Sequence, residues 1–378
     1  MMSEWKEYKL DEIADIYNNK RVPLSSIVRS KRQGKYPYYG ASGIVDYIDD
    51  YIFDGDYILI SEDGENLRSR KTPIAFRAQG KFWVNNHSHI IQGKDKFLND
   101  WITYFFKNLN VSPYLTGAVQ PKLNKENLLR IPIPIPDFES ASIITEILSS
   151  LDDKIELNNN INKELENLAQ TLFKQWFIDF EFPTEDGEPY QSSGGEMMES
   201  ELGMIPKAWE VVTLNELLTV KYGKDHKHLL DGDVPLYGSG GIMRFVEKPL
   251  YSKDSILIPR KGTLSNLFYL SEPFWSVDTM FYTEIHNPIY GKYLFFLIKG
   301  LNLASMDVGS AVPSMTTKVL NGIKVLKPND FVMLQFDKIA SSIFEIMKHN
   351  NVENQELSNL RDTLLPKLIS GEINVKDL

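Results

Sequence analysis

The sequence predicts an α+β protein built from two similar, mostly β heads, each followed by a long helix. Three observations lead to this prediction. The chain repeats itself, because a shift of 192 residues places Glu164 and Leu165 on Glu356 and Leu357. In each copy, about 130 residues rich in Tyr, Gly and Pro come first. A stretch with an apolar repeat of 3.5 residues follows. The unit is too long for a solenoid repeat, so we expect one molecule with an internal pseudo-two-fold.

Short apolar runs bounded by turn residues define the predicted elements of each head. We expect buried strands at residues 57–60 and 82–84, with counterparts at 255–258 and 274–276. Short buried helices are expected at 101–106 and 293–298. Each head ends in a strand, at 131–136 and at 323–328. The first of these has alternate prolines, so it is predicted to be an edge strand or an extended connector.

Each long helix is predicted from a seam of residues spaced alternately by four and three. The first seam is Ile144, Leu148, Leu151, Ile155, Asn158, Asn162, Leu165, Ala169, Leu172 and Trp176. The second is Phe336, Ala340, Ile343, Met347, Asn350, Asn354, Leu357, Arg361, Leu364 and Leu368. Such a seam is typical of a coiled coil. Each helix would be about 55 Å long, and Pro366 should kink or end the second near its last turns.

Two asparagines lie at the centre of each seam, and they indicate how the helices pair. In an antiparallel pair Asn158 would face Asn354, and Asn162 would face Asn350. Polar groups in an apolar seam are tolerated when they meet, so they disfavour slipped registers. A parallel pair would also match them. We favour the antiparallel pair, which would place the two heads at opposite ends.

The expected division of the chain is a head at residues 1–138, a spacer helix at 139–180, a linker at 181–203, a second head at 204–330 and a second spacer helix at 331–378. The linker contains Pro183, Asp186, Gly187 and several glutamates. This composition is typical of an exposed and mobile segment.

The composition narrows the possible functions. The chain of 378 residues has no cysteine, which excludes disulfides and thiolate metal sites. It has no apolar run of membrane-spanning length and no signal-peptide core, so a cytoplasmic location and no membrane partner are expected. The net charge of −10 is concentrated at residues 146–201, where fourteen acids and three lysines sum to −11. The remainder is therefore about +1, and local basic clusters can attract phosphates.

The sequence gives little support to a catalytic or metal-binding role. It has no phosphate-binding loop, and the glycines at 238–241 are predicted to form a turn. Asn287 to Tyr290 is similar to an adenine methyltransferase signature but lacks its second proline, so a strand-to-helix turn is expected. His87 and His89 could bind a metal, but no further ligands cluster near them, and a hydrogen-bonding or base-contacting role is favoured. We therefore expect a non-catalytic chain without a metal site.

Basic and aromatic loops in both heads predict contact with double-stranded DNA, in which lysines and arginines hold phosphates and a few side chains reach base edges. Each residue alone is also compatible with a solvated surface charge. The candidates in the first head are Lys20, Arg21, Arg29, Lys31, Arg32, Lys35, Arg68, Arg70, Lys71, His87, Gln120 and Lys122. Those in the second are Lys224, His226, Lys227, His228, Arg244, Arg260, Lys261, Asn266 and Lys318.

The loops differ between the copies whereas the helices match. Two unlike heads should read two different sequences, so the expected site is split and non-palindromic. Its halves would lie on the order of 10–17 base pairs apart.

The chain resembles the specificity subunit of type I restriction–modification systems over essentially its whole length. The resemblance is carried by the order head, helix, head, helix, and by the Tyr-Gly-x-x-Gly-Ile motifs that begin at Tyr39 and Tyr237. The Gly-x-Ala/Val-x-Pro motifs at 117–121 and 309–313, and the leucine-spaced helix ends, also carry it.

The family implies two target recognition domains held apart by antiparallel helices that act as a ruler. It also implies two methyltransferase subunits docked on the helices, joined by motor–nuclease subunits. S-adenosylmethionine, ATP and Mg are expected on those partners, and no cofactor on this chain. Two alternatives stay open: a coiled-coil adaptor whose heads bind protein, and an enzyme that acts on nucleic acid through an unrecognised site.

Overall fold

The structure is a computed structural model that describes residues 5–117, 119–261, 264–301, 303 and 315–377. The chain forms two compact units, one of Met1–Asn158 with Asn351–Leu378 and the other of Asn159–Asn350. We call them unit 1 and unit 2. Each contains one head and about half of each long helix. The units therefore cut across the predicted spacer-helix segments, because each helix contributes to the core of both units.

The head of unit 1 is a six-stranded sheet in the order β2-β7-β5-β6-β3-β4, in which only β3 and β6 are parallel. Ile58, Leu59 and Ile60 of the central strand are fully buried, since apolar clusters cover both faces of the sheet. The strand expected at 57–60 is therefore confirmed. The strands are β2 (Ala14–Ile16), β3 (Gln33–Gly40), β4 (Gly43–Ile48), β5 (Phe53–Ser61), β6 (Ala75–Val84) and β7 (Ser88–Gly93).

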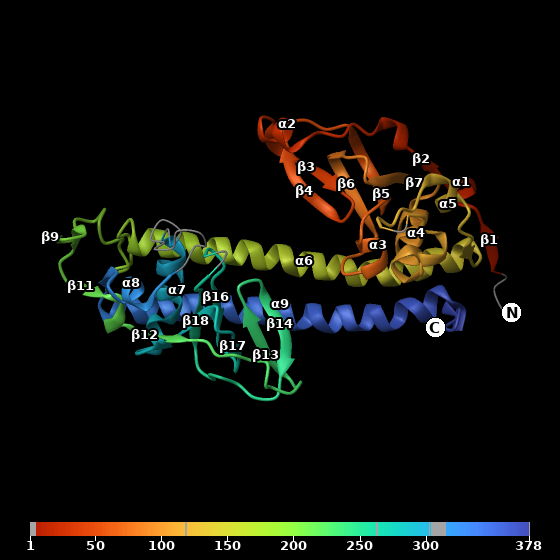
Figure 1. The fold of residues 1–378 in the computed structure, drawn as a ribbon. Helices are drawn as coiled ribbons and strands as arrows, with labels where there is room; N and C mark the ends of the chain where they lie inside the picture. The colour runs from red at the N-terminus through yellow and green to blue at the C-terminus, as the bar shows by residue number, and fades with distance from the viewer. Residues whose placement is uncertain (1–4, 118, 262–263, 302, 304–314, 378) are drawn as a thin grey trace. The chain divides into compact units, whose positions relative to one another are not determined.

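Helix α4 (Lys96–Asn108) joins this sheet to the long helices of unit 1 (Figure 1). Its Trp101 and Ile102 are fully buried in one cluster with Ile58 of the sheet and Leu148 of the first long helix. Strand β8 (Ile133–Ile135) pairs with β1 (Lys6–Tyr8) in a separate two-stranded sheet, as the alternate prolines predict. The short helices are α1 (Leu10–Ile13), η1 (Asn18–Lys20), α2 (Ser26–Ser30), α3 (Asn66–Ser69), η2 (Ser112–Tyr114) and α5 (Lys125–Leu129).

Unit 2 repeats this plan with a divided sheet, of orders β12-β18-β15-β16 and β14-β13-β17. Pro273 lies between β16 (Phe268–Leu270) and β17 (Trp275–Ser276). Because proline has no N–H, it cannot donate a hydrogen bond to a neighbouring strand. The equivalent strand of unit 1, β6, is continuous. The other strands are β12 (Leu218–Tyr222), β13 (Val234–Gly238), β14 (Gly241–Val246), β15 (Ser255–Pro259) and β18 (Met280–Ile285), and the helices are η4 (Pro288–Tyr290), α7 (Gly291–Gly300) and α8 (Thr317–Asn321).

The ends of the unit 2 head also follow the predictions. Strand β19 (Lys324–Lys327) pairs with β11 (Glu210–Thr213), which η3 (Leu214–Glu216) follows. Asn287 caps η4 between β18 and α7, so its segment is the expected strand-to-helix turn. The motif at 309–313 lies outside the described residues.

The segment at 181–203, expected to be an exposed linker, is folded onto unit 2. Phe182 is 4% exposed, and its ring stacks on Tyr190 and on Trp209. The chain then forms a hairpin of β9 (Met197–Ser200) and β10 (Gly203–Pro206). Aromatic stacking therefore holds a segment that its glycines and acids alone would leave mobile.

The long helices are α6 (Phe138–Phe177) and α9 (Asp330–Ile369), and they run antiparallel within each unit. In unit 1, Asn158 Nδ2 donates to Asn354 Oδ1 at 2.9 Å. In unit 2, Asn350 Nδ2 donates to Asn162 Oδ1 at 2.8 Å. Both pairings are those of the antiparallel register, which is therefore confirmed over the parallel alternative. The amide pairs satisfy polar groups that would otherwise be costly in the seam.

The predicted seam residues are all buried or half-buried. Arg361 interrupts the apolar character of the second seam, and its guanidinium pairs with Asp152 of α6 at 2.5 Å. Helix α9 continues past Pro366 and ends at Ile369, before η6 (Val375–Asp377). Among the described residues, no helix is both long and apolar enough to span a membrane.

The two long helices begin with equivalent caps of different charge, which gives a first prediction. Asp137 Oδ1 accepts from Ser140 N at 3.0 Å, and its Oδ2 accepts from Lys376 Nζ at 3.0 Å. These bonds lower the pKa of Asp137 to about 2. Asn329 accepts in the same way from Val332 N at 3.0 Å. We expect Asp137→Ala to lower the free energy of unfolding by about 1 kcal/mol at pH 7.

This difference should shrink as the pH falls from about 4 to about 2. A carboxylate with a depressed pKa stabilises the fold above its unfolded-state pKa and loses that contribution as it is protonated. Asn329→Ala is the control, because its loss should not depend on pH in this range. Urea unfolding of both variants measures the effect, and a pH-independent difference for Asp137→Ala would contradict the assigned cap.

Candidate nucleic-acid interface

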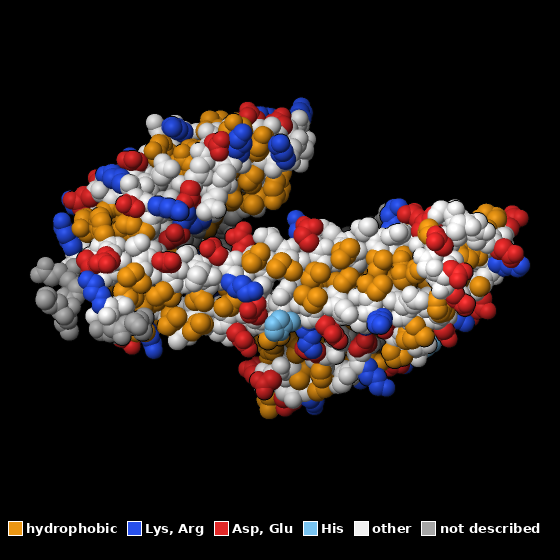
Figure 2. Space-filling view, turned by 180° about the vertical axis from the view of Figure 1, so that it is seen from behind, with side chains coloured by type: hydrophobic (Ala, Val, Ile, Leu, Met, Phe, Trp, Pro, Cys, Tyr) orange, Lys and Arg blue, Asp and Glu red, His pale blue; other side chains and the backbone are white. Residues whose placement is uncertain are grey.

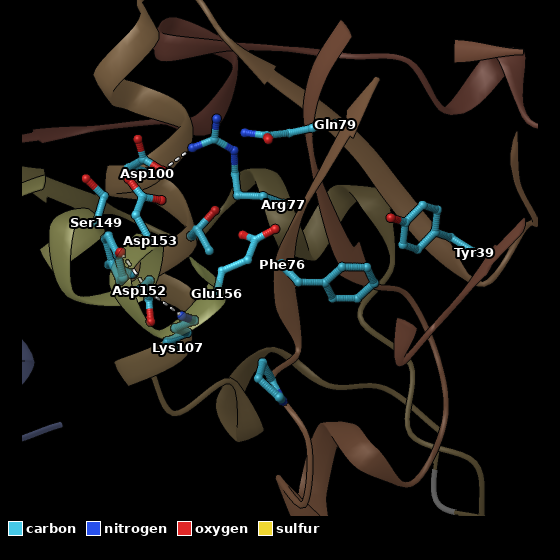
Figure 3. Close-up of a pocket in the computed structure, with 13 residues that line it drawn as sticks. Tyr39, Phe76, Arg77, Gln79, Asp100, Lys107, Ser149, Asp152, Asp153 and Glu156 are labelled. Carbon is cyan, nitrogen blue, oxygen red and sulfur yellow. Dashed lines mark hydrogen bonds and ion pairs between the residues drawn. The ribbon is translucent and has the colours of Figure 1, made fainter. Parts of the chain in front are cut away.

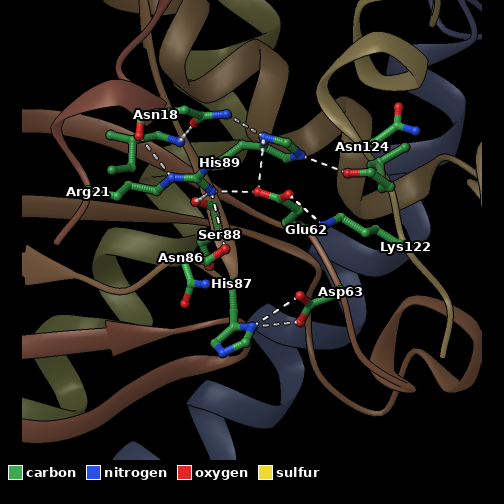
Figure 4. Close-up of polar contacts among 12 residues, drawn as sticks. Asn18, Arg21, Glu62, Asp63, Asn86, His87, Ser88, His89, Lys122 and Asn124 are labelled. Carbon is green, nitrogen blue, oxygen red and sulfur yellow. Dashed lines mark hydrogen bonds and ion pairs between the residues drawn. The ribbon is translucent and has the colours of Figure 1, made fainter. Parts of the chain in front are cut away.

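A polar network lies where β5 and β7 of unit 1 meet their loops (Figure 4). Glu62, which directly follows β5, is at its centre. Its carboxylate accepts from Arg21 at 2.5 Å and pairs with Lys122 Nζ at 3.2 Å. Arg21 also donates to the carbonyl of Ser88 at 3.0 Å. Burial alone would raise the pKa of Glu62, but the hydrogen bond from Arg21 and the other cations hold it below its ordinary value. The network therefore ties three loops to the end of one strand.

His89 closes the inner side of this network as a neutral imidazole. It is fully buried, with Nε2 at 2.7 Å from the carbonyl of Leu123 and Nδ1 at 2.8 Å from Asn18 Nδ2. Nε2 must donate to the carbonyl, so Nδ1 accepts from the amide. Burial lowers the pKa of His89. Over the described chain, no group of three or more His, Cys, Asp or Glu side chains is placed to hold a metal ion.

His87 lies at the outer rim, with Nδ1 2.9 Å from Asp63 and a half-exposed ring. The structure thus brings together Arg21, His87 and Lys122 from the predicted set. Sequence reasoning missed the acidic partners Glu62 and Asp63. A usable signal existed, since Glu62 directly follows an apolar strand and a charge in that place needs a partner.

The network gives a second prediction. Glu62→Ala should lower the free energy of unfolding by about 2–3 kcal/mol, because it leaves the guanidinium of Arg21 largely buried without its carboxylate. Asp63→Ala is the control and should cost less than about 1 kcal/mol, since its partner His87 is half exposed. Denaturant unfolding of both variants measures the two losses, and equal losses would show that Glu62 does not hold the loops.

Most of the predicted arginines are engaged within their own units. Arg29 bonds Asp46 at 2.8 Å, Arg32 bonds Asp49 at 2.9 Å and Arg244 bonds Asp231 at 2.8 Å. Arg68 donates to the carbonyl of Gly117 at 3.0 Å. Arg70 donates to three carbonyls at the end of α4, those of Phe106, Lys107 and Leu109. These hydrogen bonds therefore hold the loops that carry the arginines in place.

The predicted lysines are the freer cations. All of them are exposed. Lys122 pairs with Glu62 in the polar network. Among the described residues, no carboxylate pairs with the remaining eight, which are Lys20, Lys31, Lys35, Lys71, Lys224, Lys227, Lys261 and Lys318. Gln120 is exposed as well. Lysine ammonium groups on mobile stems suit contact with phosphates.

The remaining candidates of unit 2 lie on its loops. His226 is half-buried, and its carbonyl accepts from Arg244 at 2.8 Å. His228 stands edge-on to Trp275 with ring centroids 6.0 Å apart. Asn266 donates to the carbonyl of Ser239 at 2.9 Å, and Arg260 lies over the ring of Tyr222.

A cleft of about 480 Å³ opens in unit 1 between the sheet, α4 and α6 (Figure 3). Its cations are already paired with its acids. Arg77 bonds Asp56 and Asp100, and Lys107 lies 3.3 Å from Asp152. Both cations of the lining are therefore engaged, and since Asp153 and Glu156 also line the cleft, it carries more acids than cations.

Comparison with known proteins places these features in a family. The model of the family described as "Type I restriction modification DNA specificity domain" matches residues 2–167 and 206–359. The chain is 26% identical to a type I restriction enzyme specificity subunit of Methanocaldococcus jannaschii, over 99% of this chain and 95% of that one. A 149-residue stretch, 39% of the chain, is 44% identical to 36% of a Haemophilus influenzae homologue named as such a subunit.

The fold is also similar to a solved structure. The crystal structure of a type I restriction–modification S subunit from M. genitalium matches with a TM-score of 0.62. That match has 21% identity and covers 97% of this chain and 96% of that one.

Proposed function

The chain belongs to the type I restriction–modification DNA specificity family, and from this premise we propose how its heads and helices recognise DNA. As the specificity subunit of such a system, it reads a split, non-palindromic site with one head on each half. It performs no bond-making step itself. Adenine methylation, with S-adenosylmethionine, and ATP- and Mg-dependent cleavage belong to partner subunits.

The observation that carries this proposal is one fold used twice with different loops. Strand pairs β3–β4 and β13–β14 share a register, including a bulge at the same place, and both turns use a positive-φ glycine, Gly43 and Gly241. The loops at the strand ends differ, with the Glu62 network in one head and Arg260 over Tyr222 in the other. A shared scaffold with unlike loops supports two readers of unlike sequences.

Exposed apolar and acidic side chains on the helices support docking of two methyltransferase subunits (Figure 2). Leu168 of α6 is 56% exposed, and its repeat equivalent Leu360 of α9 is 47% exposed. Large apolar side chains exposed on a helix are typical of interaction surfaces. Because the two leucines belong to different units at equivalent positions, they fit two copies of one partner.

The exposed lysines provide the test of DNA binding. We expect the change of Lys20, Lys31 and Lys35 to glutamine to weaken binding of every duplex by a similar factor. The slope of log K against log salt should fall by up to about 3, because each phosphate contact contributes about 0.9. Lys96→Gln is the control, an exposed lysine at the start of α4. Binding by the chain with its methyltransferase partner that did not depend on salt would contradict the phosphate contacts, and binding of protein but not DNA would favour the adaptor alternative.

A further inference from the structure

The two heads place opposite charges at one equivalent backbone position. In unit 1, Glu62 N donates to the carbonyl of His87 at 2.8 Å, and the Glu62 carbonyl accepts from Leu123 N at 2.8 Å. In unit 2, Arg260 N donates to the carbonyl of Thr279 at 2.9 Å, and the Arg260 carbonyl accepts from Met315 N at 3.0 Å. His87 and Leu123 are separated from Thr279 and Met315 by the repeat of 192. Glu62 and Arg260 are therefore counterparts.

The charge of Glu62 is neutralised inside its own head. Arg21 and Lys122 pair with its carboxylate, which has a side-chain exposure of 12%, and the neutral ring of His89 lies 3.9 Å from it. Outward contact from this position is therefore limited in unit 1.

The guanidinium of Arg260 has a different environment. It lies 5.1 Å from the centroid of the Tyr222 ring, and its Nη1 donates a long hydrogen bond of 3.4 Å to the carbonyl of Asp278. Tyr222 in turn packs edge-on against Phe281, which occupies the place that His89 has in unit 1. Among the described residues, no carboxylate pairs with Arg260. Arg260 is half-buried, and the second head thus presents a guanidinium held against an aromatic face.

This inference rests on the proposed role in DNA recognition and names a residue that determines specificity: we propose that Arg260 reads a guanine in the half-site of the second head. A guanidinium donates two parallel hydrogen bonds to O6 and N7 of guanine, which is the commonest base-specific contact. Contact with the Tyr222 ring restricts the guanidinium before DNA binds, so less conformational freedom is lost on binding. The adjacent Lys261, exposed on a flexible stem, suits a phosphate instead.

The choice of guanine over phosphate can be tested with two variants of Arg260. Arg260→Lys keeps a cation over Tyr222 but removes the planar fork, and Arg260→Gln removes the charge. The control is Lys261→Gln. The assay uses the chain with its methyltransferase subunits and a duplex panel in which each base pair of the second half-site is changed in turn. Relative methylation rates, and relative affinities from competition, are measured for every duplex.

We expect the wild-type complex to prefer one G·C pair by about tenfold or more. Both Arg260 variants should lose most of this preference at that pair, with all other positions unchanged. Lys261→Gln should weaken all duplexes alike. The inference is overturned if Arg260→Lys keeps the wild-type preference, since charge alone would then suffice, or if both variants lower all duplexes equally. A wild-type complex with no two-part preference would overturn the proposed function as well.

Discussion

A heptad inserted into both long helices is expected to widen the gap between the two halves of the DNA site. Seven helical residues add about 10.5 Å of length, which corresponds to about three base pairs. The insertions belong between Asn158 and Asn162 of α6 and between Asn350 and Asn354 of α9. Both asparagine pairs then stay intact, because Asn158 pairs with Asn354 and Asn162 with Asn350. Sequencing of modified adenines in a host with the methyltransferase subunits measures the gap.

Insertion into α6 alone is the matched control. It adds the same heptad to α6 but leaves α9 at its original length, so at least one asparagine pair must be broken and its amides left without a partner in the seam. We expect this variant to be unstable and to direct little methylation. An unchanged gap with the double insertion, in a protein that still methylates, would contradict the role of the helices as a ruler.

Exchange of residues 16–91 for the same region of a relative is expected to change one half of the DNA site and leave the other intact. The structure shows why these boundaries suit an exchange. Ile16 and Ile91 are paired neighbours on β2 and β7, so both junctions fall at one place in the sheet. The segment carries β3 to β6 and their loops, while α4 and the long helices stay unchanged. The donor must keep Glu62, since Lys122 outside the segment pairs with it.

The reciprocal exchange of residues 220–283 provides the control. Val220 and Thr283 are paired in the same way on β12 and β18 of unit 2. This exchange should change the other half of the site only. If adenine sequencing showed both halves altered by either exchange, the heads would not act as independent readers.

The sequence predicted the helices and the central strands well because their signals are local. Periodicity identified the seam, and the asparagines at 158 and 162 indicated the register of the antiparallel pair, since buried amides need each other. The division of the unit 2 sheet was missed, although Pro273 marks its position. A proline interrupts a strand only where its missing N–H would have bonded a neighbouring strand. The sequence alone does not show which strands are neighbours.

The contacts of the predicted basic residues were less predictable, because they depend on partners distant in sequence. Arg21 lies 41 residues from Glu62, and Arg29 lies 17 residues from Asp46. Composition shows that a loop is basic, but it does not show which of its cations are already paired. The structure separates the arginines, which mostly bond their own unit, from the exposed lysines.

The central claim is that two unlike heads each read one half of a split site. Sequencing of modified adenines in a host that carries this chain with its methyltransferase subunits tests it most directly. The account predicts one motif with two different specified halves, separated by a gap of fixed length in which any base is accepted. A continuous motif, or two identical halves in palindromic order, would contradict it.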